Sequence, residues 1–412
     1  MEITVVTQDT RGGVQPYAAL ARALVDAGHS ARAVAPAEYA WLFERVGVDC
    51  LPLDGMSSDE SKEVALAAQS SRHGGLRTAA RALVAKVPEW AAQIHGFAEG
   101  SDLLTGGVGG TVIGEPVAAA LGVPWVPAHL QPVGMVNTIY PGVLMTGIPR
   151  AFGAAGNLVG QLLTEGAIRV PFQQAQRAAR SVLPVPRGAA KKSPGSVYGI
   201  SPAVIQPPAQ RGQTRTFTGY WFDHADPYLL PPELEEFLAN GEGKPTVSMG
   251  FGSMVAGDPD RLRDVLTRAA GDVGARVVLI GGAGAVGHQQ DRQRTDVIWV
   301  PSVPHRALFH RMDANVHHAG AGTTANALAA GVPGVTIPFG ADQPFWARRA
   351  SDLGVAPPGI PIAQLTRERL SQALHHALTD LDMRDRAADL GRRIRSEDGT
   401  GAAAQWYSTL SA

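Results

Sequence analysis

Short apolar runs alternate with amphipathic stretches from the start of the chain, and this alternation predicts strands and helices in turn. Ile3–Thr7 is an apolar run of strand length. Gly12-Gly13 predicts a turn after it, and Pro16–Ala27 predicts a helix with its apolar side chains on one face and Gly28 at its end. Ala31–Ala35 then returns as a strand. This β-α-β order predicts a parallel sheet.

The same alternation recurs further along the chain. In the first half it predicts strands at Asp102–Thr105 and Pro124–Pro127 and a helix at Thr111–Leu121. In the second half it predicts strands at Thr246–Met249 and Val277–Ile280 and a helix at Asp260–Ala270. The chain is therefore expected to contain two α/β halves of similar size.

A proline-rich stretch, Asp223–Pro232, predicts a linker between the two halves. We expect a first domain at residues 1–222 and a second at residues 233–395, with a helical segment at 396–412 packing back on the first domain. Two Rossmann-like domains with parallel sheets, facing one another, would leave an interdomain cleft at the carboxyl ends of their strands, where ligands bind in such folds. The predicted fold class is therefore α/β.

The segment from Met135 to Arg187 breaks this pattern, because it is apolar and rich in glycine and proline. It contains helical stretches at Leu158–Ile168 and Phe172–Val182. It can line a pocket for an apolar ligand, form a structural subdomain or make a weak contact with a membrane surface. Basic residues in or near the segment are expected to be ordinary solvated surface: Arg150, Arg169, Arg177, Arg180, Arg187, Lys191 and Lys192.

Composition narrows the class of protein. Among the 412 residues 45% are hydrophobic and 18% charged, which favours a large core over disorder. The formal net charge of -1 gives no reason to expect a nucleic-acid partner. The single cysteine, Cys50, excludes an intramolecular disulfide. The first residues have the character of a buried strand, and we see no uninterrupted apolar run long enough for a transmembrane helix, so a cytoplasmic protein is expected.

The strongest chemical signal is the glycine-punctuated segment His317–Thr324. A strand is predicted at Asn315–His318, so its two histidines point to opposite faces and do not chelate a metal as a pair. Gly320 and Gly322 allow the backbone to approach a ligand and expose N–H groups. Thr323-Thr324 opens a helix whose N-terminus favours an anion. Taken alone, the segment is equally consistent with an ordinary β-α turn that uses glycines for tight packing.

Flanking motifs give this segment a wider context. W-V-P-S-V-P-H runs from Trp299 to His305, and P-F-G-A-D-Q-P-F-W runs from Pro338 to Trp346. Together with the glycine turn, they resemble the donor-binding signature of GT-B glycosyltransferases, in the branches that decorate natural products and sterols. The opening T-R-G-G-V-Q-P-Y, from Thr10 to Tyr17, also matches, so the resemblance covers nearly the whole chain. It implies a UDP-glycosyltransferase that works without a catalytic metal.

The resemblance also implies roles for individual residues. His318 would contact the donor diphosphate, and the helix start would hold the phosphates through Gly320, Ala321, Gly322 and Thr323. Ser253, in G-F-G-S, would also contact phosphate, and the backbone near Val303 would meet the nucleobase. Asp342 and Gln343 would hydrogen-bond the sugar hydroxyls. In the opening segment, Arg11 and Gly12 would join the ligand-binding set, and Thr10 would be a further catalytic candidate. Ala319 stands where relatives often have glycine, and no loss is expected.

One position departs from the family pattern. Relatives carry an acid or a histidine three residues before the proline of V-Q-P, as general base, and Gly13 stands there in this chain. A positioned base is worth about 10²–10⁴-fold in rate. Asp9 can take over from a neighbouring position, Asp342 can double as the base, or the acceptor can be acidic or nucleophilic enough to need little help. The chain can also be a weak or inactive relative.

The expected function is inverting transfer of a sugar from a UDP- or dTDP-sugar to a hydrophobic small-molecule acceptor. No cofactor other than this co-substrate is expected, and the chain would be a monomer or a homodimer. A catalytically silent partner of a true transferase and a GT-B nucleotide-sugar epimerase remain as alternatives. The sequence does not select the sugar, the nucleobase or the acceptor.

Overall fold

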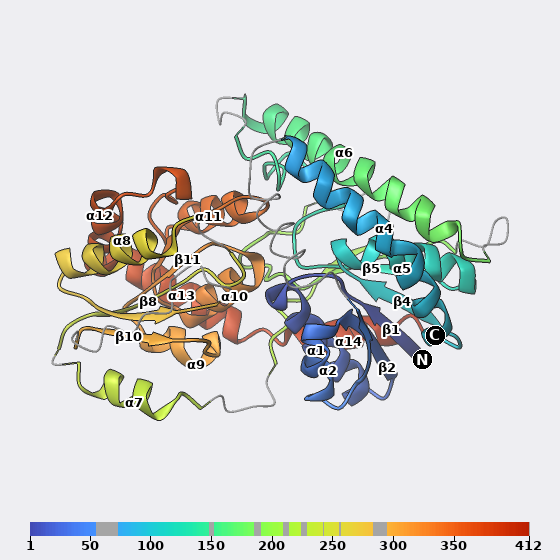
Figure 1. Ribbon diagram of the computed structural model, residues 1–412, viewed down its shortest axis with the longest axis horizontal. Helices are drawn as coiled ribbons and strands as arrows, with labels where there is room; N and C mark the ends of the chain where they lie inside the picture. The colour runs from blue at the N-terminus through green and yellow to red at the C-terminus, as the bar shows by residue number, and fades with distance from the viewer. Residues whose placement is uncertain are drawn as a thin grey trace. The chain divides into compact units, whose positions relative to one another are not determined.

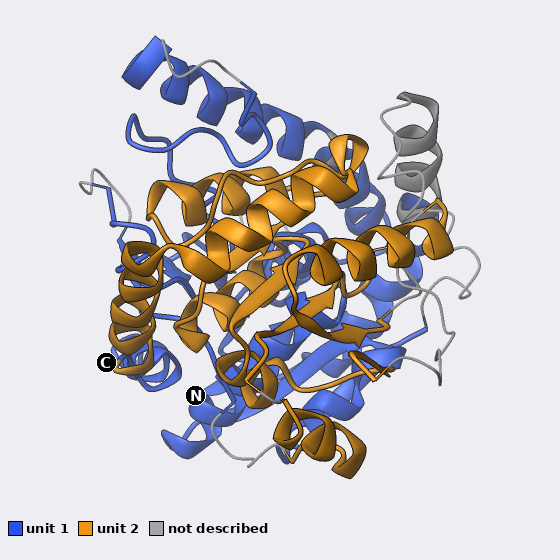
Figure 2. Ribbon diagram, turned by 90° about the vertical axis from the view of Figure 1, so that its left-hand side faces the viewer, with its two compact units in different colours: residues 1–225, 397–412 blue, residues 226–396 orange. Residues whose placement is uncertain are grey.

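The computed structural model describes residues 1–54, 73–147, 152–184, 191–208, 214–223, 229–241, 243–254, 257–282 and 295–411. The chain divides into two compact units, residues 1–225 with 397–412 and residues 226–396 (Figure 2). Half of the predicted linker, residues 224–228, lies outside the described part, as do Arg150 and Arg187. No described helix combines the length and the apolar composition needed to cross a bilayer.

Unit 1 is built on a seven-stranded parallel sheet with strand order β3-β2-β1-β4-β5-β6-β7 (Figure 1). Its strands are β1 (Glu2–Val6), β2 (Ser30–Pro36), β3 (Asp49–Leu53), β4 (Leu103–Gly106), β5 (Trp125–His129), β6 (Ser196–Tyr198) and β7 (Arg215–Phe217). Its helices are α1 (Arg11–Asp26), α2 (Trp41–Glu44), α4 (His73–Phe97), α5 (Val108–Leu121), α6 (Gly153–Arg180) and α14 (Gly399–Ser408).

Side chains of the unit 1 sheet point alternately to two hydrophobic cores, as strand geometry requires. Ile3 and Val5 join the core formed with α1, α2 and α14. Val6 joins the core on the other face, which is formed with α4, α5 and α6. The C-terminal helix completes the first core, because Tyr407 is fully buried there and its hydroxyl lies 2.5 Å from Thr105 Oγ1.

Unit 2 has a five-stranded parallel sheet with strand order β10-β9-β8-β11-β12. Its strands are β8 (Thr246–Gly250), β9 (Arg276–Ile280), β10 (Val297–Val300), β11 (Ala314–His317) and β12 (Gly334–Thr336). Its helices are α7 (Pro232–Ala239), α8 (Pro259–Asp272), α9 (His305–Leu308), α10 (Ala321–Ala330), α11 (Gln343–Asp352), α12 (Arg367–Thr379) and α13 (Leu381–Arg395). Short 3-10 helices lie at Ala37–Tyr39 in unit 1 and at Phe309–Arg311 and Ile362–Gln364 in unit 2.

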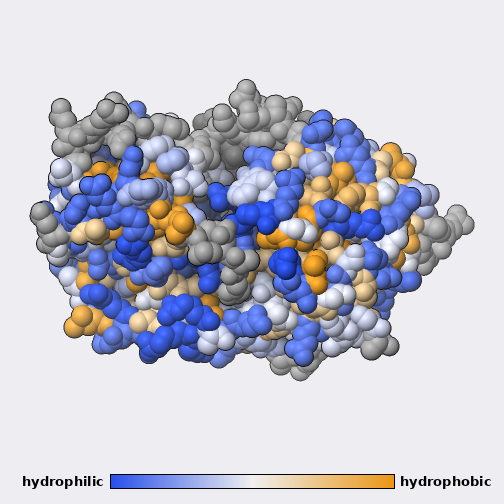
Figure 3. Space-filling model, turned by 90° about the horizontal axis from the view of Figure 1, so that it is seen from below, coloured by the Kyte–Doolittle hydropathy of each residue, from blue (hydrophilic) through white to orange (hydrophobic). Residues whose placement is uncertain are grey.

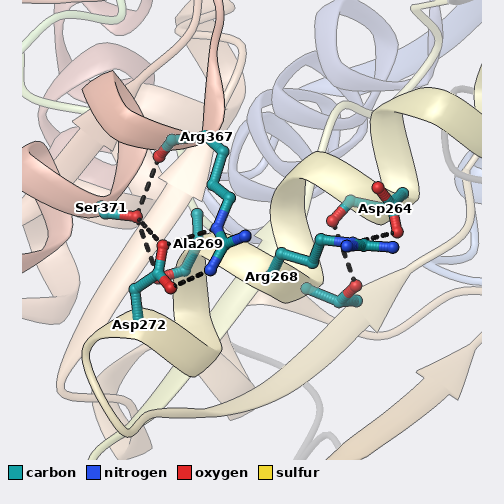
Figure 4. Close-up of polar contacts among 7 residues, drawn as sticks. Asp264, Arg268, Ala269, Asp272, Arg367 and Ser371 are labelled. Atoms are coloured by element: carbon teal, nitrogen blue, oxygen red, sulfur yellow. Dashed lines mark hydrogen bonds and ion pairs between the residues drawn. The ribbon is translucent and has the colours of Figure 1, made fainter.

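Helices α8 and α12 cover one face of the unit 2 sheet and are joined at their ends by polar contacts (Figure 4). The Arg367 guanidinium donates to both carboxylate oxygens of Asp272, and the Ser371 hydroxyl donates to Asp272 Oδ2 at 2.7 Å. The Arg367 and Ser371 hydrogen bonds lower the pKa of Asp272 to about 2. This link lies at the surface, so burial of apolar side chains beneath it supplies most of the stabilisation.

The α/β class with parallel sheets is confirmed, and two helix predictions are corrected. Helix α1 begins at Arg11 instead of Pro16, so Gly12-Gly13 lies in its first turn and is not the predicted turn. Pro16 lies inside the helix, in its second turn, where it removes one backbone hydrogen bond at a cost that packing of the other turns offsets. Helix α6 is continuous, although the sequence predicted two separate helical stretches within the same region.

Candidate functional site

The topology of each sheet creates a point where loops from neighbouring strands diverge. In unit 2 the chain passes from β8 to β9 and β10, then returns to place β11 on the other side of β8. In doubly wound sheets, ligands bind beside the carboxyl ends of the strands at such a switch point. The loops that follow β8 and β11 carry Ser253 and His318, and a Cβ on Gly252 would lie 3.1 Å from Cε1 of the His318 ring. The fold therefore brings these two sequence-predicted segments together.

The paired histidines have different surroundings. His317 ends β11, and its Nδ1 accepts a hydrogen bond from the Ala319 amide at 3.1 Å. His318 lies just beyond the strand, so the predicted strand was one residue too long at this end. Among the described residues, the buried Nδ1 of His318 has no hydrogen-bond partner. His317 thus supports the turn, whereas His318 keeps a polar atom available for a ligand.

Burial also sets the charge of these imidazoles. Desolvation lowers the pKa of His318 to about 4 and that of His317 to about 3. Both rings are therefore neutral near pH 7. A neutral imidazole can still donate one N–H to an anion, and a bound anion would favour the protonated form.

The N-terminus of α10 lies directly after this turn. Its N-cap is Gly320, which has no side chain to cap the first amides, and the first turn contains no acidic residue. Thr324 Oγ1 is buried and has no hydrogen-bond partner within the described chain. By contrast, α8, α12 and α13 are capped by the side chains of Asp258, Thr366 and Asp380. The helix start that holds Ala321, Gly322 and Thr323 is therefore suited to an external anion.

Backbone strain lies beside the same site. In the described chain two residues other than glycine have positive φ, namely Ala319 at 64° and Ala341 at 54°. The left-handed conformation costs an alanine about 1–2 kcal/mol. Ala319 joins β11 to α10, and Ala341 precedes the Asp342-Gln343 pair. Such strain persists where the surroundings hold the backbone, and it clusters at ligand sites.

Asp342 and Gln343 already have protein partners. Asp342 is the N-cap residue of α11, and its Oδ2 accepts a hydrogen bond from the Trp346 indole at 3.0 Å. The Gln343 side-chain oxygen accepts from the Phe339 amide at 2.7 Å, and its nitrogen lies 3.1 Å from the sulfur of Met254. Gln343 therefore fixes the turn before α11 and joins it to the loop after β8. Both residues are held in place by bonds that the sequence did not reveal.

Val303 belongs to the apolar cluster formed with β9, β10 and α9, where its side chain is buried. A ligand that meets Val303 would therefore contact its backbone, which is the contact that the resemblance implies. Within the described residues no group of three or more His, Cys, Asp or Glu side chains is arranged to hold a metal ion.

Unit 1 has its own switch point, between β1 and β4. Asp9 and Thr10 follow β1, and the Thr10 amide donates to Asp9 Oδ1 at 2.6 Å. A Cβ on Gly13 would overlap the Asp9 carboxyl group, so Asp9 fills the space that a side chain at position 13 would need. Asp9 is exposed to solvent on one side. Desolvation by the surrounding protein raises the pKa of its carboxyl, and this effect outweighs the hydrogen bonds with Thr10, which lower the pKa.

The other two predicted residues of this segment differ in their environment. The Arg11 guanidinium lies 5.5 Å from the centre of the Trp41 ring, in a cation–π contact. Gly12 faces open space, because no atom lies within 4 Å of a Cβ built on it. Gly12 therefore leaves room beside Thr10, whereas Arg11 contacts unit 1 itself.

Sequence reasoning missed the glycine run that follows β4. Cβ atoms on Gly109 and Gly110 would collide with the backbone oxygens of Gln8 and Val6, and one on Gly107 would collide with the Tyr17 hydroxyl. Gly109 and Gly110 let the first turn of α5 lie directly against the end of β1 and the loop that carries Asp9. The signal was present in the sequence as four glycines in five residues, at the end of a predicted strand.

Comparison with known proteins adds the family. Residues 263–400 match the model of the Erythromycin biosynthesis protein CIII-like, C-terminal domain. A sterol 3-beta-glucosyltransferase of Neurospora crassa is 30% identical over 98% of this chain and 27% of its own length. The chain thus spans about a quarter of that curated relative.

Solved structures agree on the fold. The glycosyltransferase of kitacinnamycin superposes with a TM-score of 0.69 at 19% identity, over 99% of this chain and 98% of that one. The glycosyltransferase VinC, solved in complex with dTDP, superposes with a TM-score of 0.68 at 18% identity, over 100% of this chain and 99% of that one. These likenesses confirm the predicted GT-B fold. The chain therefore has the GT-B fold, and over nearly its whole length it is similar to a sterol 3-beta-glucosyltransferase.

Proposed function

We propose that this chain is an inverting glycosyltransferase that moves a sugar from a UDP- or dTDP-sugar to a hydrophobic small-molecule acceptor. The observation that carries the proposal is the uncapped start of α10 beside a buried, unpartnered His318 Nδ1. Backbone amides and a neutral imidazole donor suit a diphosphate leaving group. The names of the relative and of the two solved structures point to glycosyl transfer and give no support to an epimerase.

In this mechanism the acceptor oxygen attacks the anomeric carbon, and the bond from that carbon to the diphosphate breaks. The electron pair leaves with the nucleoside diphosphate. His318, Thr323 and the amides of Ala321 and Gly322 stabilise the charge that develops on it, and Ser253 adds a hydroxyl donor. The helix and these donors supply the stabilisation that a catalytic metal supplies elsewhere. Asp342 and Gln343, held by their protein partners, orient the sugar hydroxyls.

Asp9 is the proposed general base, with Thr10 as the group that orients it. Its carboxyl fills the space beside Gly13, and the raised pKa makes it a better proton acceptor than an ordinary surface aspartate. Asp342 is the weaker candidate, because one of its oxygens accepts the Trp346 indole hydrogen bond. The alternative to a protein base is an acceptor that is acidic or nucleophilic enough to react without one.

Donor binding is tested by thermal shift and calorimetry with UDP, dTDP and their glucose conjugates. A nucleotide that binds the native chain should raise the melting temperature by mass action. His318→Ala should reduce turnover about 10²–10³-fold with an unchanged melting temperature of the free protein. His375→Ala, which replaces an exposed histidine of α12, is the matched control.

Transfer is then measured on the purified chain with phenolic and alcoholic acceptors. Nucleotide binding without transfer or donor hydrolysis would identify a silent partner, and sugar turnover without acceptor would identify an epimerase. Either result would overturn the proposed function.

A further inference from the structure

In the first half of helix α6, polar side chains are buried and apolar side chains are exposed, which is the reverse of an ordinary amphipathic helix. In its first half the residues turned inward are small or polar, and Gln161 and Thr164 are each 1% exposed. The outward face over the same turns is apolar, with Leu162 56% and Val170 64% exposed. Leu158, Val159 and Leu163 are further exposed apolar side chains of the helix, Phe152 and Val182 flank it, and Val136, Ile139 and Leu144 are exposed in the loop after β5.

This inversion is fixed by hydrogen bonds to the loop after β5. Asn157 donates to the carbonyls of Thr138 and Ile139 at 3.0 Å, and Gln161 donates to those of Tyr140 and Pro141 at 3.2 and 3.1 Å. Rotating the helix to bury its leucines would remove these bonds and leave backbone carbonyls unsatisfied.

Two further contacts hold the same orientation. Glu165 accepts a hydrogen bond from the Gly134 amide at 2.7 Å. A Cβ on Gly142 would collide with the carbonyl oxygen of Gly160, so the loop backbone lies directly against the helix. The apolar side chains are therefore presented to solvent by a fixed backbone.

Charge changes along the outward face. Arg169, Arg177 and Arg180 are exposed and follow the apolar turns at the spacing that keeps them on the same side of the helix. Within residues 152–184 the single acidic side chain is Glu165, which is bonded to the loop. Lys191 and Lys192, further along the chain, are both exposed. The outward face thus carries exposed apolar side chains without charge over its first turns and gains arginines toward its end.

We infer that the outward face of α6 docks on an anionic phospholipid surface, with Leu162, Leu163 and their neighbours entering the interface and the arginines contacting headgroup phosphates. A basic amphipathic helix that lies in a membrane interface combines these two features. A symmetric pair with the two α6 helices parallel would bring like charges together. The face seen in Figure 3, in contrast, mixes hydrophilic residues with hydrophobic ones in small groups.

This surface belongs to unit 1 alone, and the inference stands whether or not the chain transfers sugars. Flotation with vesicles of phosphatidylcholine, alone or mixed with phosphatidylglycerol, tests it on the full chain. Binding should be at least about tenfold stronger with phosphatidylglycerol and should weaken as salt is raised. The triple substitution Val159→Ser, Leu162→Ser and Leu163→Ser should reduce binding about tenfold or more. Arg169→Gln with Arg177→Gln and Arg180→Gln should remove the preference for the anionic lipid.

The matched control is Leu229→Ser with Leu381→Ser, which removes two leucines that are 86% and 70% exposed elsewhere. Its vesicle binding should equal that of the unchanged chain, and circular dichroism should show the same melting temperature for all variants. Failure of the unchanged chain to float with anionic vesicles would overturn the inference. So would a dimer in size-exclusion chromatography that only the triple serine variant dissociates, because α6 would then be a subunit interface.

Discussion

The two switch points of this molecule share one topology and present opposite chemistry. In unit 1 the loop after β1 offers a carboxylate, Asp9, and the first turn of α5 packs against this loop through its glycines. In unit 2 the loop after β11 offers amides and a neutral histidine, with no acid in the first turn of α10. In the proposed mechanism the first site accepts a proton and the second stabilises an anion. The same scaffold can therefore divide two parts of one reaction through the few residues that follow its strands.

The largest expected effect concerns the carboxylate side of this comparison. Asp9→Asn should lower kcat about 10²–10⁴-fold on an alcohol acceptor with little change in KM, because a base acts in the transition state. Asp9→Gly with Gly13→Asp should recover much of that loss, since the new side chain takes the space that Asp9 vacates. Steady-state kinetics of the single and double variants measure both effects.

A comparison of acceptors distinguishes catalysis by a protein base from the reaction of an acceptor that needs no base. If phenols and alcohols react equally well in Asp9→Asn, Asp9 is not the base. If Gly13→Asp fails to rescue Asp9→Gly although the double variant is folded, the two positions do not share one catalytic space.

Changing the pH tests whether His318 contacts the bound diphosphate in unit 2. The folded pKa of His318, about 4, lies below the ordinary value of about 6.5 expected in the unfolded chain. As pH falls from about 6.5 to 4 the unfolded state binds more protons, so the free protein should lose stability over this range. A bound diphosphate favours protonated His318, so the rise in melting temperature caused by UDP or dTDP should grow as pH falls from 7 to 5.

His318→Gln is the control for this pH series, because the nucleotide itself also titrates near neutral pH. The increase in the nucleotide-dependent shift should be smaller in this variant than in the unchanged chain. Identical pH profiles for the two proteins would show that His318 does not meet the phosphates.

The smallest expected effect concerns backbone strain, which in the described chain lies beside the anion site and not beside Asp9. Ala341→Gly should raise the free energy of unfolding by about 0.5–1 kcal/mol, because glycine adopts positive φ without strain and this alanine is exposed. Ala402→Gly, at an exposed position inside α14, should lower it by a similar amount. Urea unfolding measures both changes in the free energy of unfolding. If Ala341→Gly lowers this free energy as Ala402→Gly does, the backbone at Ala341 is not strained.

Periodicity predicted the parts of the fold that depend on local sequence. The β-α-β order, and most strands to within one or two residues, followed from runs such as Ile3–Thr7, because burial on both faces of a parallel sheet requires apolar residues. The glycine turn after β11 was also visible. The start of α1 was not, because Gly12, Gly13 and Pro16 are all poor helix formers whose cost is offset by packing of the remaining turns.

The rest depended on contacts between distant segments. Gln343 reaches Met254 across the sheet, and no local pattern announces that pairing. The positive φ of Ala319 is likewise imposed by its surroundings, since alanine does not favour it. The overlap between Asp9 and position 13 is local in the sequence, but it depends on how the chain turns between β1 and α1. For the same reason the inverted faces of α6 could not be assigned from composition alone.

Helix α14 has a consequence for the order in which the protein matures. Its Ala403, Ala404 and Tyr407 are part of the same core as Ile3 and Leu20, although nearly four hundred residues separate them along the chain. During synthesis on the ribosome, the first unit must wait with an incomplete interior until the last segment emerges, while residues 226–396 can already condense. The part made first is thus finished last, and its exposed half-core is where a chaperone would be needed.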